Sequence, residues 1–190
     1  GIITNTGLYT VNLAVMGFSS NVNMLKTETV FTKFRDLVGN QKDEYVVVSP
    51  DLGSVTRARN FASRLDLSLA IVDKRCQRAS VCEVMNIIGD VRDKRVILVD
   101  DMIDTAGTLC NAATALVEKG GAKSVIATAT HGVLSGPALE RLEGSNITEL
   151  ALLNTIPETQ GAGCSKIKYL SVAPMFGEAI ERIYQEISIA

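Results

Sequence analysis

Short apolar runs, rich in Val, Ile and Leu, recur along this chain and alternate with segments of helical periodicity. Runs of this kind cover residues 45–48, 69–72, 96–99 and 150–153. Because polar residues do not alternate within them, these runs are typical of strands buried on both faces of a parallel sheet. The strand–helix rhythm therefore predicts an α/β fold, with a parallel central sheet and helices on both faces.

Helical spacing and end signals separate the predicted strands. Apolar residues at 30, 31, 34, 37 and 38 lie on one face of a helix that starts near residue 24 and ends at Gly39-Asn40. Further helices are expected over 55–65, 109–118, 137–142 and 175–187, and further strands over 125–130 and 167–172. Residues 73–82 are basic and irregular, and we expect a loop there.

Composition excludes several classes of protein. The 190 residues carry 19 Lys and Arg against 21 Asp and Glu, a net charge of −2, with 46% hydrophobic residues. This composition favours a folded core and argues against a disordered chain. No apolar stretch reaches the roughly 18 residues of a membrane span, and the balanced charge argues against nucleic-acid binding. We expect neither a membrane nor a nucleic acid as partner.

The cysteines and the first residues bear on location. Cys76, Cys82, Cys110 and Cys164 include no CxxC pair, so we expect free thiols in a reducing, cytoplasmic compartment. The chain begins at Gly1 without a basic segment followed by an apolar one, so a secretory signal is not expected. Because it also begins without Met, we expect a fragment or a processed chain.

The segment after the run 96–99 carries the strongest chemical signal. Ligands of open α/β sheets bind beyond the carboxyl ends of strands. Here two carboxylates, Asp100 and Asp101, precede Asp104 and a run of small residues that opens a helix. In this run Gly107 permits a positive φ and close approach, and the helix N-terminus favours an anion. Carboxylates beside such a loop suit the hydroxyls of a sugar phosphate.

Competing interpretations of the same segment are weaker. Asp104 and Thr105 could simply cap the helix, with Asp100 and Asp101 solvated at the strand end. A cap, however, requires one such residue rather than three acids and a run of small residues. The chain has neither GxxxxGK[ST] nor GxGxxG, which argues against a P-loop ATPase and a dinucleotide-binding domain.

Several segments together resemble the ribose-phosphate pyrophosphokinase (phosphoribosyl-pyrophosphate synthetase) family, whose domains have the type I phosphoribosyltransferase fold. The segments are Val47-Val48-Ser49-Pro50-Asp51, Val72-Asp73-Lys74-Arg75, Val99-Asp100-Asp101-Met102-Ile103-Asp104-Thr105-Ala106-Gly107-Thr108 and Thr130-His131-Gly132-Val133-Leu134-Ser135-Gly136-Pro137. The resemblance spans about residues 46–187 and implies the C-terminal half of such an enzyme. It divides the chain into residues 1–45, a remnant of or lead-in from an N-terminal domain, and a phosphoribosyltransferase-like domain over 46–190.

The resemblance also implies a reaction, in which diphosphate passes from ATP to ribose 5-phosphate and leaves AMP, with Mg²⁺ as cofactor. Residues carried over for the 5-phosphate are Asp104, Thr105, Ala106, Gly107 and Thr108, with Asp100 and Asp101 on the ribose hydroxyls. Residues carried over for the pyrophosphate and nucleotide side are Asp51, Gly53 and Ser54, with Asp51 at the metal. Lys74 and Arg75 would be catalytic, with Lys74 on a mobile loop, and a homo-oligomer is expected.

Four departures from the family pattern oppose full activity. Most of an N-terminal domain is missing, Val11 stands in the region of an expected metal-binding His, Ser54 replaces a second glycine, and Cys76 replaces an arginine. Two hypotheses follow: an enzyme that is weak or inactive as this chain alone, or a non-catalytic homologue that binds sugar phosphate or nucleotide, or regulates by co-assembly. A base phosphoribosyltransferase is a third. His131 lies near a nucleotide pocket or makes only a local hydrogen bond.

Overall fold

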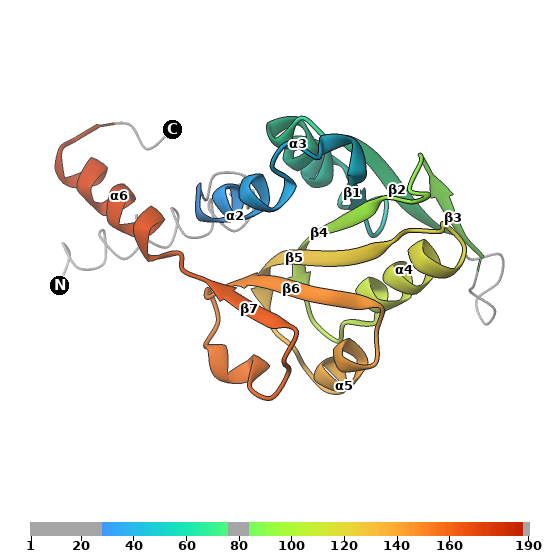
Figure 1. Ribbon diagram of the computed structural model, residues 1–190. Helices are drawn as coiled ribbons and strands as arrows, with labels where there is room; N and C mark the ends of the chain where they lie inside the picture. The colour runs from blue at the N-terminus through green and yellow to red at the C-terminus, as the bar shows by residue number, and fades with distance from the viewer. Residues whose placement is uncertain (1–27, 76–83, 188–190) are drawn as a thin grey trace.

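A computed structural model describes residues 28–75 and 84–187 (Figure 1). The helices are α2 (Glu28–Val38), α3 (Val55–Leu65), α4 (Gly107–Glu118), α5 (Ala138–Glu143) and α6 (Ala173–Tyr184), with 3-10 turns at Lys42–Glu44 and Glu158–Gly161. The strands are β1 (Tyr45–Ser49), β2 (Ser68–Arg75), β3 (Val84–Ile88), β4 (Arg95–Ile103), β5 (Ser124–Gly132), β6 (Ile147–Leu153) and β7 (Ile167–Leu170).

The strands form one sheet in the order β3-β2-β1-β4-β5-β6-β7, and every neighbouring pair except β2 and β3 is parallel. The α/β fold with a mostly parallel sheet is thus confirmed. After β1 the chain adds β2 on one side, and from β4 onward it builds on the other side. The carboxyl edge between β1 and β4 is therefore the switch point, where open α/β sheets bind ligands.

Helices cover both faces of the sheet, as expected (Figure 1). On one face, α2 and α3 meet through Phe31 and Phe34, whose rings lie 5.1 and 5.4 Å from that of Phe61. On the other face, α4 and α5 pack through fully buried side chains such as Leu116 and Leu142. The two faces correspond to two separate apolar clusters that hold the sheet between them. The division of the chain at residue 45 stays a prediction.

Two local expectations were wrong, and one strand was not predicted. Residues 73–75 are not a loop, because they extend β2 and pair with β3. The strand 96–99 does not stop before its acids, because pairing with β5 continues to Ile103 and Gly132, so Asp100 and Asp101 belong to β4. Residues 84–88, for which no element was predicted, form an antiparallel edge strand, a direction that apolar content alone does not specify.

Candidate active site

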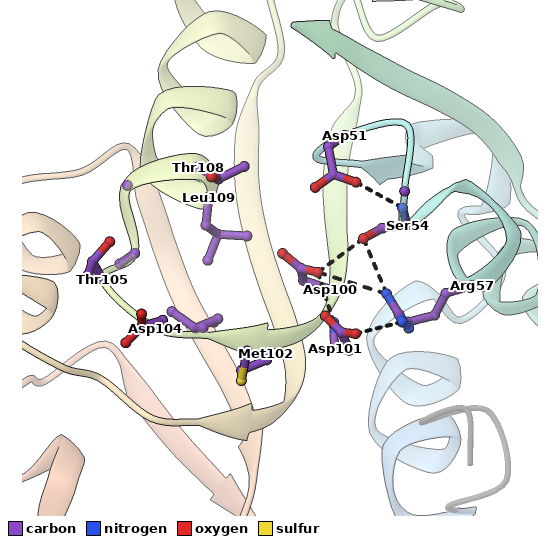
Figure 2. Close-up of a pocket in the computed structure, with 14 residues that line it drawn as sticks. Asp51, Ser54, Arg57, Asp100, Asp101, Met102, Asp104, Thr105, Thr108 and Leu109 are labelled. Atoms are coloured by element: carbon purple, nitrogen blue, oxygen red, sulfur yellow. Dashed lines mark hydrogen bonds and ion pairs between the residues drawn. The ribbon is translucent and has the colours of Figure 1, made fainter. Parts of the chain in front are cut away.

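A polar cavity of about 420 Å³ opens at the carboxyl edge between β1 and β4 (Figure 2). Its walls come from the end of β4, the start of α4, and the loop from β1 into α3. The lining residues are Asp51, Gly53, Ser54, Arg57, Asp100, Asp101, Met102, Ile103, Asp104, Thr105, Ala106, Gly107, Thr108 and Leu109. All the residues predicted for ribose 5-phosphate and for the pyrophosphate side therefore lie around one cavity.

The loop from β4 into α4 lines this cavity and leaves backbone donors at the start of the helix. No side chain caps α4, whose N-cap residue is Ala106 in the left-handed conformation at φ 59°. The first intrahelical bond joins the Cys110 amide to the Ala106 carbonyl, at 3.0 Å, so the earlier amides of the helix are left without intrahelical acceptors. Such amides, together with the helix dipole, favour an anion.

Two details of this loop correct the sequence analysis. The left-handed residue is Ala106 rather than Gly107, which is outside the positive-φ region. A Cβ on Gly107 would lie 3.4 Å from Arg141 Nη1 and 3.8 Å from Thr105 Oγ1, so the glycine leaves room beside a guanidinium. The alternative in which Asp104 caps the helix is wrong, because the Asp104 carboxylate instead accepts a hydrogen bond from the Ser135 hydroxyl.

The segment between β5 and α5 supports the loop through its backbone as well. The Ser135 amide donates to the Asp104 carbonyl at 3.0 Å, and the Leu134 amide donates to the Ile103 carbonyl at the same distance. Leu134 is buried in the core cluster of this face. The loop is therefore held from outside by a neighbouring segment, while its inner side lines the cavity.

Asp100 and Asp101 form the second part of the site. Burial raises the pKa of Asp100 to about 6, with the neighbouring Asp101 carboxylate adding to the rise. Two hydrogen bonds to Asp100 Oδ1 lower the same pKa, one from the Asp101 amide at 2.9 Å and one from the Ser54 hydroxyl at 3.1 Å. Asp101 pairs with Arg57 Nη2 at 2.8 Å. Carboxylates held in this way are suitable acceptors for sugar hydroxyls.

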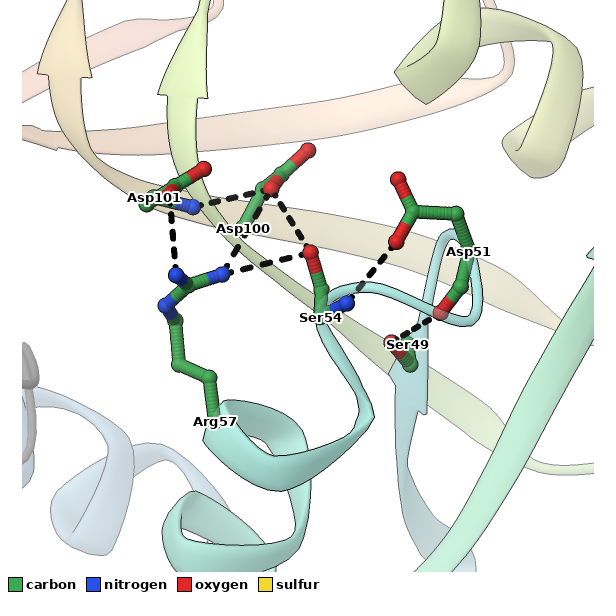
Figure 3. Close-up of polar contacts among 6 residues, drawn as sticks. All are labelled: Ser49, Asp51, Ser54, Arg57, Asp100 and Asp101. Carbon is green, nitrogen blue, oxygen red and sulfur yellow. Dashed lines mark hydrogen bonds and ion pairs between the residues drawn. The ribbon is translucent and has the colours of Figure 1, made fainter.

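The loop from β1 into α3 binds its own polar groups (Figure 3). The Ser54 amide donates to Asp51 Oδ1 at 2.8 Å, and the Ser49 hydroxyl donates to the Asp51 carbonyl at 2.7 Å. A side chain on Gly53 would press against the same Asp51 oxygen at 3.3 Å. The Ser54 hydroxyl accepts a bond from Arg57 Nη1 at 3.2 Å while donating to Asp100. Ser54 thus links the two loops.

Lys74 and Arg75 lie at the carboxyl end of β2. The register places Ile71 beside Ser49, so both residues extend beyond the end of β1 on the same edge of the sheet. Lys74 belongs to the strand and pairs with Met85, so its placement on a loop was wrong. Val11 and Cys76 fall outside the described residues. The catalytic role of Lys74 and Arg75 stays a prediction.

Three contributors to the site had no role in the sequence analysis. Arg57 follows Ser54 by three residues, one helical turn, and this spacing could have placed it on the cavity side of α3. Ser135 and Arg141 come from a segment about 30 residues beyond the loop that they contact. No local pattern relates residues so far apart. His131 lies in β5 and contacts a residue just past β6, with its Nδ1 2.8 Å from the Thr155 hydroxyl oxygen.

The donor set is compatible with Mg²⁺. The cavity presents carboxylate oxygens, the hard ligands that Mg²⁺ prefers, and Asp51 is among them. Over residues 28–75 and 84–187, no group of three or more His, Cys, Asp or Glu could hold a metal. Proteins commonly bind Mg²⁺ through one or two carboxylates together with substrate phosphates, which agrees with these residues.

No helix in the described ranges is long and apolar enough to cross a membrane.

Comparisons with known proteins agree with this geometry. The chain is 60% identical over 151 residues to the ribose-phosphate pyrophosphokinase of Clostridium tetani, covering 80% of this chain and 47% of that protein. It is 37% identical to the phosphoribosylpyrophosphate synthetase of Mycobacterium smegmatis, with a TM-score of 0.68, covering 80% of this chain and 50% of that one. The chain thus spans about half the length of the relatives it matches.

A more distant likeness confirms the phosphoribosyltransferase fold. The structure of the adenine phosphoribosyl transferase of Trypanosoma brucei is matched with a TM-score of 0.50 at 19% identity, covering 83% of this chain and 67% of that one. A family model described as the phosphoribosyl synthetase-associated domain matches residues 77–190. Since that match covers more than half of the chain, this chain belongs to the phosphoribosyl synthetase-associated family.

Proposed function

We propose that this chain supplies the ribose 5-phosphate part of the active site of a ribose-phosphate diphosphokinase. In this reaction the anomeric hydroxyl of ribose 5-phosphate attacks the β-phosphorus of ATP, and phosphoribosyl pyrophosphate and AMP result. The observation that carries the proposal is the juxtaposition, in one cavity, of the uncapped first turn of α4 with Asp100 and Asp101. One part suits a phosphate, and the other suits vicinal hydroxyls.

The remaining residues are assigned by their place around the same edge. Asp51 and its loop, which includes Gly53 and Ser54, would face the diphosphate of ATP. Asp51 would also hold Mg²⁺, which when bound neutralises phosphate charge. Phosphoryl transfer depends mostly on positioning and on such charge neutralisation. Lys74 and Arg75, at the end of β2, would supply cations for the transferred phosphates.

The second candidate is a homologue that binds sugar phosphate without catalysis. The loop from β1 into α3 favours it, because the Ser54 amide is already bonded to Asp51. In sequence, Cys76 also replaces an arginine expected by resemblance. We expect the 190-residue chain to release little AMP from ATP, and Cys76→Arg alone to restore little, because the adenine side of the site requires a further domain.

Self-association and location remain predictions. Ile180 and Tyr184 on α6 are 66% and 89% exposed, and Ile183 on the same helix is 42% exposed. Exposed apolar residues of this kind mark interfaces, which supports a homo-oligomer. A cytoplasmic location stays a prediction, which rests on the spacing of the cysteines.

Calorimetry with three probes tests the proposed function. The chain should bind ribose 5-phosphate about tenfold more tightly than inorganic phosphate, and ribose least of all, because both parts of the cavity contribute. Asp101→Asn should remove most of that tenfold advantage while leaving phosphate affinity nearly unchanged. Asp90→Asn is the matched control, since Asp90 precedes β4, outside the cavity lining. Equal affinity for ribose 5-phosphate and phosphate in the wild-type chain would contradict the proposal.

A further inference from the structure

The cavity is short of positive charge for the ligand that we assign to it. Among the described residues that line it, four are aspartates, Asp51, Asp100, Asp101 and Asp104, and the cation is Arg57. Arg57 is already paired with Asp101 at 2.8 Å and lies 3.9 Å from Asp100. A phosphate ester brings further negative charge, and the cations assigned so far face the phosphates of ATP, so a cation beside the α4 amides would strengthen the 5-phosphate subsite.

Arg141 of α5 reaches the phosphate loop from outside this lining. Its Nη1 donates to the Thr105 carbonyl at 2.9 Å, and the missing side chain of Gly107 leaves room beside it. Arg141 and Gly107 both border a second cavity of about 490 Å³, between α4 and α5. Gly107 lines both cavities, so the loop that carries it is shared between the proposed phosphate subsite and the cavity that Arg141 borders.

The bond to the Thr105 carbonyl fixes the direction of the next amide, that of Ala106. A trans peptide is planar, and its C=O and N–H point in opposite directions. Because the Thr105 carbonyl is turned toward Arg141, the N–H of Ala106 in the same peptide is turned the other way. Ala106 also holds a left-handed backbone, which non-glycine residues adopt at a cost, so this conformation needs support from its surroundings.

The short helix that carries Arg141 is itself fixed. Lys166 Nζ donates to three carbonyls at its C-terminal end, those of Leu142 and Glu143 at 2.8 Å and of Ser145 at 2.9 Å. The Ser165 amide donates to Glu143 Oε1 at 2.8 Å. These contacts anchor α5 to the segment that precedes β7. Arg141 therefore extends from an anchored backbone toward the loop.

We propose that Arg141 is the positioning residue of the phosphate subsite. It holds the Thr105 carbonyl away from the cavity, so that the Ala106 amide faces the ligand, and it places a guanidinium charge behind the amides of residues 106–108. The inference rests on the proposed function, because it assigns a phosphate group to this loop. It extends that function to a residue outside the cavity lining and outside the sugar-phosphate segment of the sequence.

Inorganic phosphate is the probe for the test, with binding followed by calorimetry and by the amide NMR signals of residues 105–108. Arg141→Met should weaken phosphate binding about fivefold to tenfold and should reduce the phosphate-induced shift of the Ala106 amide. Arg141→Lys, which keeps the charge, should recover part of the affinity. Arg92→Gln is the matched control, because Arg92 packs beside Gly121, past the other end of α4. It should bind phosphate like the wild type.

A folded Arg141→Met variant with wild-type phosphate affinity and an unchanged Ala106 shift overturns the inference. Should that variant unfold, Arg141→Gln takes its place under the same criterion. A wild-type chain that binds phosphate at this loop, but ribose 5-phosphate no more tightly, overturns the proposed function alone. In that case the phosphate affinities of Arg141→Met and the wild type still test the role of Arg141. A wild-type chain without phosphate-induced shifts at residues 105–108 overturns both.

Discussion

Two strand–loop–helix units border the same cavity and give their aspartates different hydrogen-bond partners. In the unit from β4 to α4, the Asp104 carboxylate is bonded to Ser135, and no side chain caps the helix. In the unit from β1 to α3, the Asp51 carboxylate accepts the Ser54 amide, at 2.8 Å. No side chain caps α3 either, so the two units differ in the partner of the aspartate, which is a distant serine hydroxyl in the first loop and a backbone amide of the same loop in the second (Figure 3).

The difference shows that local sequence alone does not decide which partner such an aspartate binds. Both loops place an aspartate two or three residues before the N-cap, and either carboxylate is close enough in sequence to accept a helix-end amide. At Asp104 a distant segment competes successfully for the carboxylate. A tertiary contact therefore holds the Asp104 carboxylate away from the amides at the start of α4, in addition to the backbone that forms the loop.

Asp100 connects the two units, and replacing it should have the largest effect. Its pKa of about 6 lies above the ordinary 3.8, so between these values the folded chain retains a proton that the unfolded chain has released. The buried carboxylate therefore lowers stability as pH rises through that window, and the cost is complete above it. Asp100→Asn should raise the free energy of unfolding by about 1–2 kcal/mol at pH 8.

Urea unfolding at two pH values measures this effect. At pH 3.5 Asp100 is protonated in the folded chain and mostly protonated in the unfolded chain, so most of the gain should disappear. Asp90→Asn, at an exposed aspartate outside the cavity, should show no such pH-dependent gain. Equal stability of Asp100→Asn and the wild type at pH 8 would show that burial does not strain this carboxylate. A gain in stability would mark a residue kept for its chemistry rather than for folding.

The next test makes the loop from β4 into α4 resemble the loop from β1 into α3, in which the aspartate accepts a backbone amide. Ser135→Ala removes the hydroxyl that holds Asp104, so the carboxylate becomes available to cap α4 as Asp51 bonds to Ser54. We expect phosphate affinity to fall about tenfold, because the carboxylate then competes for the same amides. The helix should gain about 0.5 kcal/mol from its cap. Calorimetry with phosphate and thermal unfolding measure the two effects.

A double variant makes this test specific. Ser135→Thr keeps the hydroxyl and should bind phosphate like the wild type. Adding Asp104→Ala to Ser135→Ala removes the competing carboxylate and should restore most of the lost affinity. If the double variant binds as weakly as Ser135→Ala, the loss comes from a displaced backbone, and the comparison between the two loops does not explain it.

The sequence predicted the parts of this architecture that depend on local patterns. Buried strands and amphipathic helices leave periodic signals, and the acids after the run 96–99 indicated the cavity. The direction of β3 and the continuation of β4 through Asp100 were missed, because strand pairing is decided by the neighbouring strand. Arg141 and Ser135 were missed for the same reason: their contacts join segments that only the fold brings together.

Replacing Ser54 should have the smallest effect, and it separates two roles of this side chain. The Cβ could obstruct the loop from β1 into α3, or the hydroxyl could connect that loop to Asp100. Ser54 is 5% exposed, and its hydroxyl donates to Asp100 at 3.1 Å. Ser54→Gly removes the Cβ and should raise the affinity for inorganic pyrophosphate about threefold, if the Cβ restricts approach to this loop. Ser54→Ala keeps the Cβ and removes only the hydroxyl, so it should leave pyrophosphate affinity unchanged.

Both Ser54 variants should raise the pKa of Asp100, because the Ser54 hydroxyl bond lowers it. Competition calorimetry with pyrophosphate, and carboxyl NMR signals for Asp100, measure the two effects separately. Equal pyrophosphate affinity in the glycine and alanine variants would show that the Cβ does not obstruct the loop, and that Ser54 acts there only through its bond to Asp100.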